Sequence, residues 1–164
     1  ITMFRFFTVY GPWGRPDMAP FKFTKAIFNG EPIDVYNHGD MRRDFTYIDD
    51  LVTGMRLLID AIPNASRTIP QVSYVNDSKS KVAPFRIVNI GNSEPSQLLD
   101  FVGAFEKSIG IKAVKILMPM QAGDVPATWA DTSLLEELTG YKPNTDLLVG
   151  VQKFVNWYRE YYHV

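Results

Sequence analysis

Apolar positions recur along the chain at spacings that change repeatedly between those of strands and those of helices. Short alternating or continuous apolar runs predict strands, because successive side chains of a strand point to opposite faces. Longer stretches with apolar residues three and four apart predict helices. The expected strands are 3–10, 33–36, 43–48, 85–90 and 114–117, and the expected helices are 17–29, 49–62, 98–109, 134–139 and 147–162. Strands and helices that alternate in this way indicate an α/β fold.

The first expected strand, 3–10, is apolar on both faces, which is typical of a parallel strand covered by helices on both sides. The sequence opens inside this strand without an initiator methionine, so we expect a piece of a longer chain. Because an unpaired apolar strand invites pairing, we also expect another copy of the chain to cover it, which makes a homo-oligomer.

Polar and glycine residues mark the expected helix ends. Asp17 and Asp49 are candidate caps of the helices that follow them, and Gly30 is a stop signal for the first helix. Three candidates could cap the helix 134–139: Asp131, Thr132 and Ser133. The helical spacing after Asp49 is carried by Val52, Met55, Leu58, Ile59 and Ile62. The polar stretch 63–84 is expected to be a long surface loop.

Composition narrows the function classes. The 164 residues suit a single domain, 1–164, and the 17 basic and 18 acidic residues give no charge footprint for nucleic acid or an anionic membrane. With no cysteine, and with His38 and His163 far apart, no metal site is expected. No apolar run approaches the roughly 20 residues that span a bilayer, and no secretory signal is recognisable, so we expect no membrane partner and a cytoplasmic location.

The clearest candidate chemistry lies in 42–50, where two arginines precede a short alternating run. The planar guanidinium of Arg43 fits a pair of phosphate oxygens. From these residues alone, the segment is either a phosphate clamp at a strand-to-helix junction or a solvated arginine pair. Lys22, near the start of the helix 17–29, is likewise either solvated or directed at a substrate anion.

Catalytic and cofactor-binding patterns are missing from the sequence. A dinucleotide needs a glycine-rich turn whose backbone amides approach phosphate, and the segment 11–14 places a proline and a tryptophan between its glycines. Asp49 and Asp50 are neighbours on a helix, so their carboxylates do not face each other. We therefore expect no catalytic residue in this chain.

Several short segments resemble, in this order, the C-terminal part of an extended short-chain dehydrogenase/reductase. They are RFFTVYGP (5–12), RPDMA (15–19), RDFTYIDD (43–50), NIGN (89–92), and GDV (123–125) followed by Ala130-Asp131. The sequence is similar to nucleotide-sugar epimerases, and within them to UDP-glucuronate 4-epimerases. The resemblance implies a small C-terminal substrate-binding lobe with one strand left over from the Rossmann sheet. The N-terminal domain, which would bind NAD and carry a Tyr-x-x-x-Lys pair, is missing.

The resemblance also implies residues that bind the UDP part of a UDP-sugar. Arg43 matches the arginine that grips the diphosphate, and Asp124 matches an acid that accepts the ribose hydroxyls. Tyr36, with the backbone of Asp34 beside it, matches a strand that binds the uracil. An aromatic face suits this task because every base offers a π surface.

Four further positions are implied in the same way. Thr8 matches a polar position near the diphosphate and sugar, and Lys22 falls where some glucuronate epimerases place a cation that faces the sugar carboxylate. Phe6 matches a residue near the nicotinamide ring of NAD. Gln121 stands where many galactose-type epimerases carry a second arginine, so it keeps a donor but loses a charge.

The implied function is the UDP-sugar-binding portion of an NAD-dependent nucleotide-sugar 4-epimerase that acts on UDP-glucuronate. A tyrosine of the missing lobe would remove the 4-hydroxyl proton, while NAD takes the C4 hydride and returns it to the opposite face. This chain would hold UDP while the sugar turns, and alone it would be inactive. The alternatives are a non-catalytic nucleotide-binding or scaffold module, and the lobe of a UDP-sugar decarboxylase or dehydratase.

Overall fold

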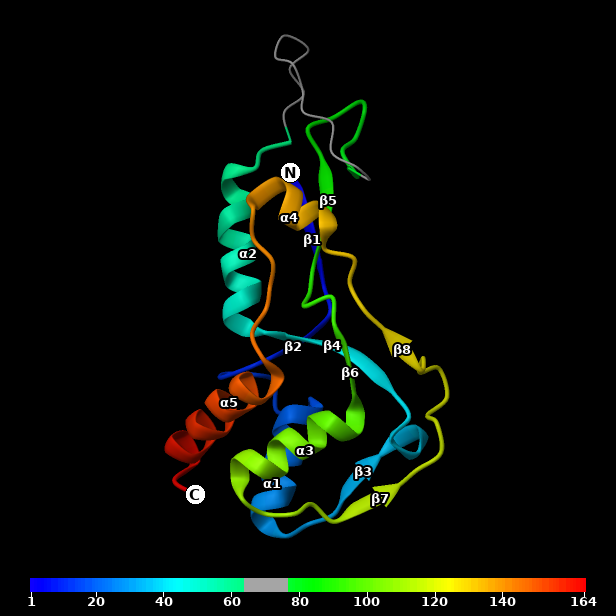
Figure 1. The fold of residues 1–164 in the computed structure, drawn as a ribbon, viewed down its shortest axis with the longest axis vertical. Coiled ribbons are helices and arrows are strands. Elements are labelled where there is room, and N and C mark those ends of the chain that lie inside the picture. The colour runs from blue at the N-terminus through cyan, green and yellow to red at the C-terminus, as the bar shows by residue number, and fades with distance from the viewer. Residues whose placement is uncertain (64–76) are drawn as a thin grey trace.

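A computed structural model of the chain describes residues 1–63 and 77–164 (Figure 1). Helices and strands alternate as expected for an α/β fold. The helices are α1 (Ala19–Asn29), the 3-10 turn η1 (Tyr36–Gly39), α2 (Ile48–Asp60), α3 (Leu98–Ile109), α4 (Ser133–Thr139) and α5 (Leu147–Tyr162). The strands are β1 (Thr2–Phe6), β2 (Thr8–Tyr10), β3 (Ile33–Val35), β4 (Arg42–Tyr47), β5 (Arg86–Ile90), β6 (Pro95–Gln97), β7 (Lys115–Leu117) and β8 (Ala127–Thr128).

Strand β4 is the central element of the sheet structure. It pairs in parallel with β2 and β8 and antiparallel with β6. Two smaller parallel pairs, β1 with β5 and β3 with β7, lie on either side of it (Figure 1). The pair β3–β7 lies beside α1 and α3, whereas β1–β5 lies beside α2 and α4.

Two hydrophobic clusters meet at the C-terminal end of β4. The larger one joins α1, α3 and α5 to β3 and β4, and Phe101 and Phe105 are fully buried at its centre. The smaller one joins α2 and α4 to β5, with Ile90 and Leu135 fully buried. Ile48, the residue after β4, contacts both clusters. One strand therefore connects the two parts of the core.

The carboxylate of Asp44 fixes β4 to two other segments. It is fully buried and accepts hydrogen bonds from the backbone N–H groups of Asn92 at 2.8 Å, Ser93 at 3.0 Å and Ala130 at 3.0 Å. Gly91 makes this approach possible, because a Cβ there would lie 2.7 Å from Oδ2 of Asp44. Hydrogen bonds to a charged group are the stronger kind, so this buried carboxylate holds the start of β4 in place.

Two of the expected helix caps are corrected by the structure. Met18 precedes α1, and Asp17 instead receives a 3.0 Å hydrogen bond from Nε of Arg15. Asp49 lies inside the first turn of α2, since Tyr47 is the residue before the helix. A capping side chain must precede the first helical residue, and both carboxylates are out of register for that role.

The other helix signals agree better with the structure. Gly30 ends α1 in the left-handed conformation, as predicted. Among the three candidates before α4, Thr132 occupies the cap position without a side-chain bond, and Oδ1 of Asp131 accepts from the backbone N–H of Ser133 at 3.0 Å. None of the described helices is both long enough and apolar enough to traverse a bilayer.

The expected strand 3–10 is divided into two strands that belong to different sheets. β1 pairs with β5, whereas β2 pairs with β4. Met3 and Phe6 on β1 remain 50% and 57% exposed. The expectation of burial on both faces is thus wrong for the described chain, because within it β5 is the only strand beside β1.

Part of the expected loop 63–84, residues 64–76, lies outside the described residues. In the described remainder, Asp77 is joined to β5 through Arg86, whose Nε lies 2.9 Å from Oδ1 of Asp77.

Candidate functional site

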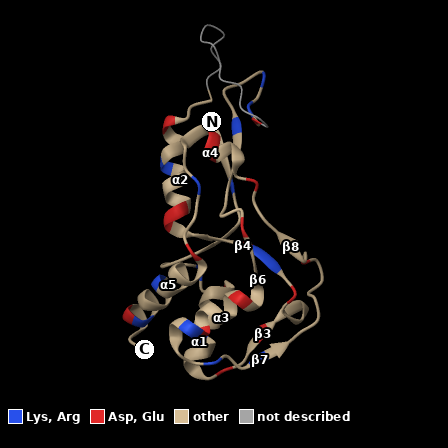
Figure 2. Ribbon diagram, viewed as in Figure 1, with Lys and Arg blue, Asp and Glu red and all other residues tan. Residues whose placement is uncertain are grey.

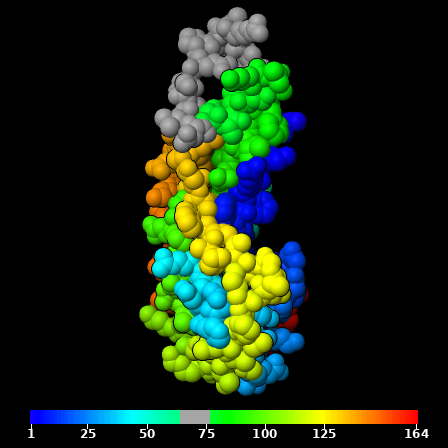
Figure 3. All heavy atoms as spheres, turned by 90° about the vertical axis from the view of Figure 1, so that its right-hand side faces the viewer, coloured from blue at the N-terminus to red at the C-terminus, as the bar shows by residue number. Residues whose placement is uncertain are grey.

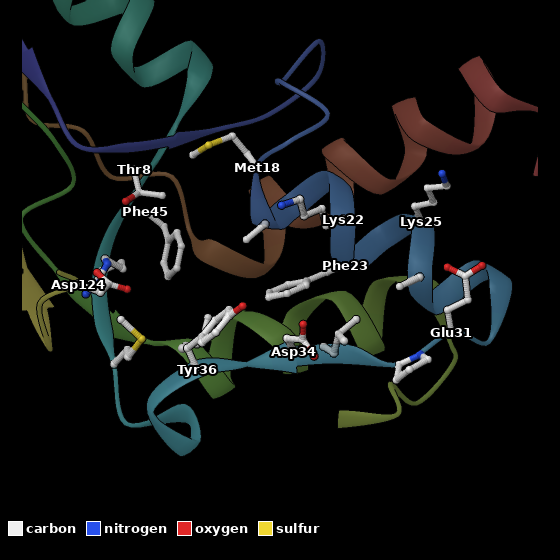
Figure 4. Close-up of a pocket in the computed structure, with 17 residues that line it drawn as sticks. Thr8, Met18, Lys22, Phe23, Lys25, Glu31, Asp34, Tyr36, Phe45 and Asp124 are labelled. Atoms are coloured by element: carbon white, nitrogen blue, oxygen red, sulfur yellow. The ribbon is translucent and has the colours of Figure 1, made fainter. Parts of the chain in front are cut away.

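A cavity of about 600 Å³ lies between α1, β3 and β4 (Figure 4). This volume is within the usual range for small-molecule sites. The structure brings six of the predicted site residues to its wall: Thr8, Lys22, Asp34, Tyr36, Arg43 and Asp124. They come from β2, α1, β3, η1, β4 and the segment between β7 and β8. Residues up to 116 positions apart in the sequence are therefore neighbours around one hollow.

Arg43 carries the positive charge at one end of the cavity. Its backbone is fixed between two strands, because it pairs with Ser96 of β6 and with Thr128 of β8. Its Nη2 donates to Oδ1 of Asp124 at 2.6 Å, and its side chain is only 17% exposed. The same Oδ1 accepts from the backbone N–H of Val125 at 2.9 Å. The guanidinium is thus held in a defined position, with further N–H donors available for an anion.

The segment that carries the acidic partner is anchored at both of its ends. The backbone of Met118 donates to the carbonyl of Val35 and accepts from the N–H of His38, each at 2.9 Å. At the other end, the N–H of Arg42 donates to the carbonyl of Pro126 at 2.8 Å. Figure 3 shows the yellow segment before β8 lying along the cyan segment of η1 and β4. Its position relative to β4 therefore depends on backbone hydrogen bonds as well as the ion pair.

Three aromatic rings line the middle of the cavity. Figure 4 shows Tyr36, Phe23 and Phe45 around the hollow, from η1, α1 and β4 respectively. Phe45 is fixed from behind by Phe101, whose ring stacks on it at a centroid distance of 3.7 Å. This wall offers flat apolar surface to a planar ring, the kind of surface on which bases stack.

An unusual backbone turn presents Tyr36. The two residues that follow it, Asn37 and His38, both have left-handed conformations, with φ of 49° and 53°. Nδ2 of Asn37 donates to the carbonyl of Asp40 at 2.6 Å and closes the turn. Gly39 is required there, because its φ is 86° and a Cβ would lie 2.6 Å from Cγ of Leu99. Left-handed non-glycine residues cost free energy, and they often occur at functional sites.

Lys22 extends from α1 across the upper wall of the cavity, toward the side on which Thr8 lies (Figure 4). Figure 2 shows basic residues on α1 and at the start of β4, the two elements that flank the hollow. The cavity wall therefore combines cations with hydroxyl and carboxylate acceptors. In the described part of the chain, no group of three or more histidines or carboxylates is arranged to hold a metal ion.

Two of the predicted site residues are not on the cavity wall. Gln121 is exposed, and it contributes to the site through its backbone carbonyl, which accepts a hydrogen bond from the backbone N–H of Asp124 at 3.1 Å. Phe6 lies at the end of β1, exposed to solvent. Neither side chain contributes to the cavity that the other six residues share.

Sequence reasoning missed several residues that line the cavity. They include Met18, Phe23, Lys25, Glu31, Met41 and Leu98. A signal existed for Lys25, which follows Lys22 by three residues and so shares its helix face. Phe23 lies within the predicted helix 17–29, where its local sequence does not connect it with a binding site. The others become neighbours of the site only through the packing of α1, β3 and α3.

Comparison with known proteins finds similarities that agree with one another. A model of the NAD dependent epimerase/dehydratase family matches residues 1–70. A probable UDP-glucuronate 4-epimerase of Rhizobium meliloti is 52% identical over 98% of this chain and 47% of its own length. UDP-glucuronate 4-epimerase 4 of Arabidopsis thaliana is 45% identical over 99% of this chain and 36% of its own length. The chain thus spans about half the length, or less, of these curated relatives.

The fold leads to the same family. The UDP-glucuronic acid 4-epimerase of Bacillus cereus, solved with UDP-glucuronic acid and NAD, superposes with a TM-score of 0.79. It is 30% identical, and the match covers 98% of this chain and 46% of that one. The UDP-glucose 4-epimerase of Thermotoga maritima, at 21% identity and a TM-score of 0.78, supports the fold alone. The chain is therefore similar to the NAD dependent epimerase/dehydratase family over residues 1–70 and, over nearly all of its own length, to about half the length of UDP-glucuronate 4-epimerases.

Proposed function

We propose that this chain is the C-terminal UDP-sugar-binding lobe of an NAD-dependent nucleotide-sugar 4-epimerase that acts on UDP-glucuronate. The observation that carries the proposal is the convergence of Arg43, Asp124 and Tyr36 on one cavity. A cation, a hydroxyl acceptor and an aromatic face are the groups that a diphosphate, a ribose and a base require. The similarity to UDP-glucuronate 4-epimerases supports the same assignment.

The lobe contributes binding and orientation. Arg43 pairs with the diphosphate, Asp124 accepts the ribose hydroxyls, and Tyr36 and the Asp34 backbone hold the uracil. Thr8 lies on β2 at the Arg43 end of the cavity, because Thr8 and Phe45 are paired in register and Phe45 is two residues from Arg43. A sugar beyond the diphosphate would therefore meet Thr8. Holding the nucleotide tightly leaves the sugar free to turn between hydride removal and return.

Bound NAD would supply the hydride acceptor and donor for C4 of the sugar. This chain offers one residue for it, Phe6, whose exposed ring at the end of β1 can lie against a nicotinamide. The sequence contains no glycine-rich turn for the dinucleotide phosphates. The cofactor therefore depends on residues outside this chain, and the catalytic acid and base must lie there as well.

An acidic sugar is favoured by the charge on the cavity wall. Lys22 brings a second cation to the same hollow as Arg43, and its amino group is directed toward the Thr8 side in Figure 4. A carboxylate on the sugar would be stabilised by this lysine, whereas a neutral sugar would gain little from it. UDP-glucuronate thus fits the wall better than UDP-galactose.

Calorimetry of UDP, UDP-glucuronate and UDP-galactose against the chain tests the proposal. We expect UDP to bind, and UDP-glucuronate to bind more tightly than UDP-galactose. Lys22→Met should remove this preference, while the exposed Lys142→Met on the α4–α5 connection should leave it unchanged. Failure of the unmodified chain to bind UDP would refute the proposal.

A turnover assay separates binding from catalysis. With NAD and UDP-glucuronate added, we expect the isolated chain to release no 4-epimerised product, because the acid, the base and the dinucleotide-binding turn are absent from it. Measurable 4-epimerisation would show that the division of labour proposed here is wrong.

A further inference from the structure

An aromatic patch, formed by Trp13, Trp157 and Tyr161, lies on the surface beside the C-terminal helix α5. Trp13 is 73% exposed and Tyr161 is 51% exposed, and their ring centroids are 5.2 Å apart. The ring of Trp157 contacts both, at 5.4 Å from Trp13 and 5.6 Å from Tyr161. None of the three rings lines the cavity described above. Large aromatic side chains gathered on a surface are typical of protein interfaces, so this patch is a candidate for one.

The backbone holds Trp13 in the patch at a conformational cost. Its φ is 64°, in the left-handed region that bulky residues rarely adopt. The turn that contains it is closed by a hydrogen bond from the N–H of Gly14 to the carbonyl of Gly11 at 3.2 Å. Strained residues often occur where a side chain has a functional task. Here the strained turn places a largely exposed indole against the rings of α5.

The outward face of α5 carries two charges next to the patch. Val149, Lys153, Asn156 and Glu160 are exposed at intervals of four, three and four residues, so they share one helix face. Neither Lys153 nor Glu160 forms an ion pair within the described part of the chain, although Nζ of Lys153 lies 5.0 Å from the ring centroid of Tyr47. The two charges are two turns, or roughly 10 Å, apart along the helix and cannot pair with each other.

A second copy of α5, lying antiparallel to the first, would bring opposite charges together. If the two-fold axis passes between Asn156 and Trp157, position 153 of each helix lies opposite position 160 of the other. Lys153 then faces Glu160 twice, and the tryptophan rings of the two copies approach each other beside the axis. This complementarity of a surface to itself is what a two-fold interface requires.

We propose that α5 and the aromatic patch form a two-fold interface with a second copy of this chain. Figure 1 shows α5 at the outside of the molecule, away from β1 and β8. The interface is therefore separate from the exposed strand β1, and it does not depend on the proposed UDP-sugar binding.

Sedimentation velocity of the 164-residue chain tests this interface in a Met3→Ser/Phe6→Ser background, which removes association through β1. We expect a dimer in this background. Glu160→Lys or Lys153→Glu alone places like charges opposite each other twice, so each should weaken the dimer by about tenfold or more. An equimolar mixture of these two variants should restore the dimer, because every facing pair in a mixed dimer again has opposite charges.

Matched controls come from α4 and the connection after it. Glu137→Lys and Lys142→Glu reverse charges at exposed positions away from α5 and should leave the dimer unchanged. Trp13→Asn keeps a residue that tolerates the left-handed backbone, and loss of the ring should weaken the dimer by about tenfold.

Three results would overturn the interface. The first is a monomer in the serine background, and the second is a dimer that both charge reversals at positions 153 and 160 leave intact. The third is a mixture of these two variants that stays monomeric, because facing helices must then regain their opposite charges.

Discussion

The guanidinium of Arg43 and the carboxylate of Asp124, 81 residues apart in the sequence, form an ion pair at 2.6 Å on the cavity wall. The residue proposed to hold a diphosphate therefore already has an anionic partner from its own chain. A ligand must share the guanidinium with this carboxylate or displace it. The pair is partly exposed, so its own contribution to stability is small and exchange with a ligand is inexpensive.

Removal of the guanidinium should weaken binding more than any chemical step. We expect Arg43→Ala to reduce UDP-sugar affinity by roughly 1.5–3 kcal/mol, the range for hydrogen bonds to a charged group. Calorimetry with UDP-glucuronate measures it, on this chain or on a full-length parent. Arg56→Ala, at an exposed position of α2, is the control. Unchanged affinity in Arg43→Ala would remove the clamp assignment.

Neutralising Asp124 should change the affinity for the diphosphate and the affinity for the ribose in opposite directions. Asp124→Asn frees the guanidinium, so inorganic pyrophosphate should bind roughly three- to tenfold more tightly. UDP should gain less, because the same substitution weakens an acceptor of the ribose hydroxyls. Titration of both ligands gives the comparison, with the exposed Asp60→Asn as control. Weaker pyrophosphate binding in Asp124→Asn would contradict the competition between carboxylate and ligand.

The buried carboxylate of Asp44 should matter for stability. Asp44→Asn preserves shape, but it replaces a charged acceptor of three backbone N–H groups with an amide whose nitrogen faces donors. We expect unfolding free energy to fall by roughly 2–4 kcal/mol, as for other disrupted buried networks. Urea denaturation measures it. If the midpoint moves no more than in the exposed Asp60→Asn, the carboxylate does not fix β4.

The pH dependence of stability should contain a contribution from Glu106. Burial by itself would raise the pKa of Glu106, but hydrogen bonds from Lys115, Lys112 and the Ala113 backbone lower that pKa from 4.5 to about 2. Because the folded value is the lower one, the stabilisation is fully present above pH 4.5 and is lost as the pH falls toward 2.

Glu106→Gln should therefore lower unfolding free energy by roughly 1–3 kcal/mol at pH 7 and flatten the decline between pH 4.5 and 2. Denaturation at pH 7, 4.5 and 2.5 measures both effects. Glu137→Gln, exposed on α4, should keep the slope of the unmodified chain. The same slope in Glu106→Gln would show that the lysines do not hold this carboxylate ionised.

The exposed apolar residues of β1 should cause self-association. Met3 and Phe6 are half exposed on a strand with a free edge among the described residues, so we expect more than one copy of the isolated chain in light scattering. Replacement of both by serine should shift the mass toward the monomer, and Val82→Ser, at a 95% exposed position off the strand, should not. A strict monomer with unmodified β1 would count against the prediction.

Local signals predicted much of the secondary structure. The glycines at 30, 110 and 140 follow α1, α3 and α4 in left-handed conformations, as their place after a periodic apolar stretch predicts. The inner face of α2 was predicted less well. Leu51 and Leu58 are buried there, whereas Val52 and Ile59 are 54% and 71% exposed. Helix α2 has two apolar stripes, one with Leu51 and Leu58 and one with Val52 and Ile59. Spacing alone cannot predict which of them packs against β5 and α4.

Some residues of the candidate site could likewise be predicted from local sequence, whereas others are brought to it by long-range packing. Arg43, Tyr36 and Asp124 were found through motifs that resemble those of a known family, and the structure places them on one cavity. Glu31 and Met41 were missed, because nothing in their own neighbourhood distinguishes them from ordinary loop residues. Their place on the wall follows from the pairing of β3 with β7 and from the packing of α1 on α3.

Strand β4 contributes to the ligand cavity at its start and leads into both apolar clusters at its end. A molecule held by its first residues therefore stabilises the segment on which the whole core depends. Heating should consequently melt the molecule in one cooperative step, whose midpoint rises with nucleotide concentration through mass action. A simple dye-based melting curve would then serve as a screen for the nucleotides that this protein accepts.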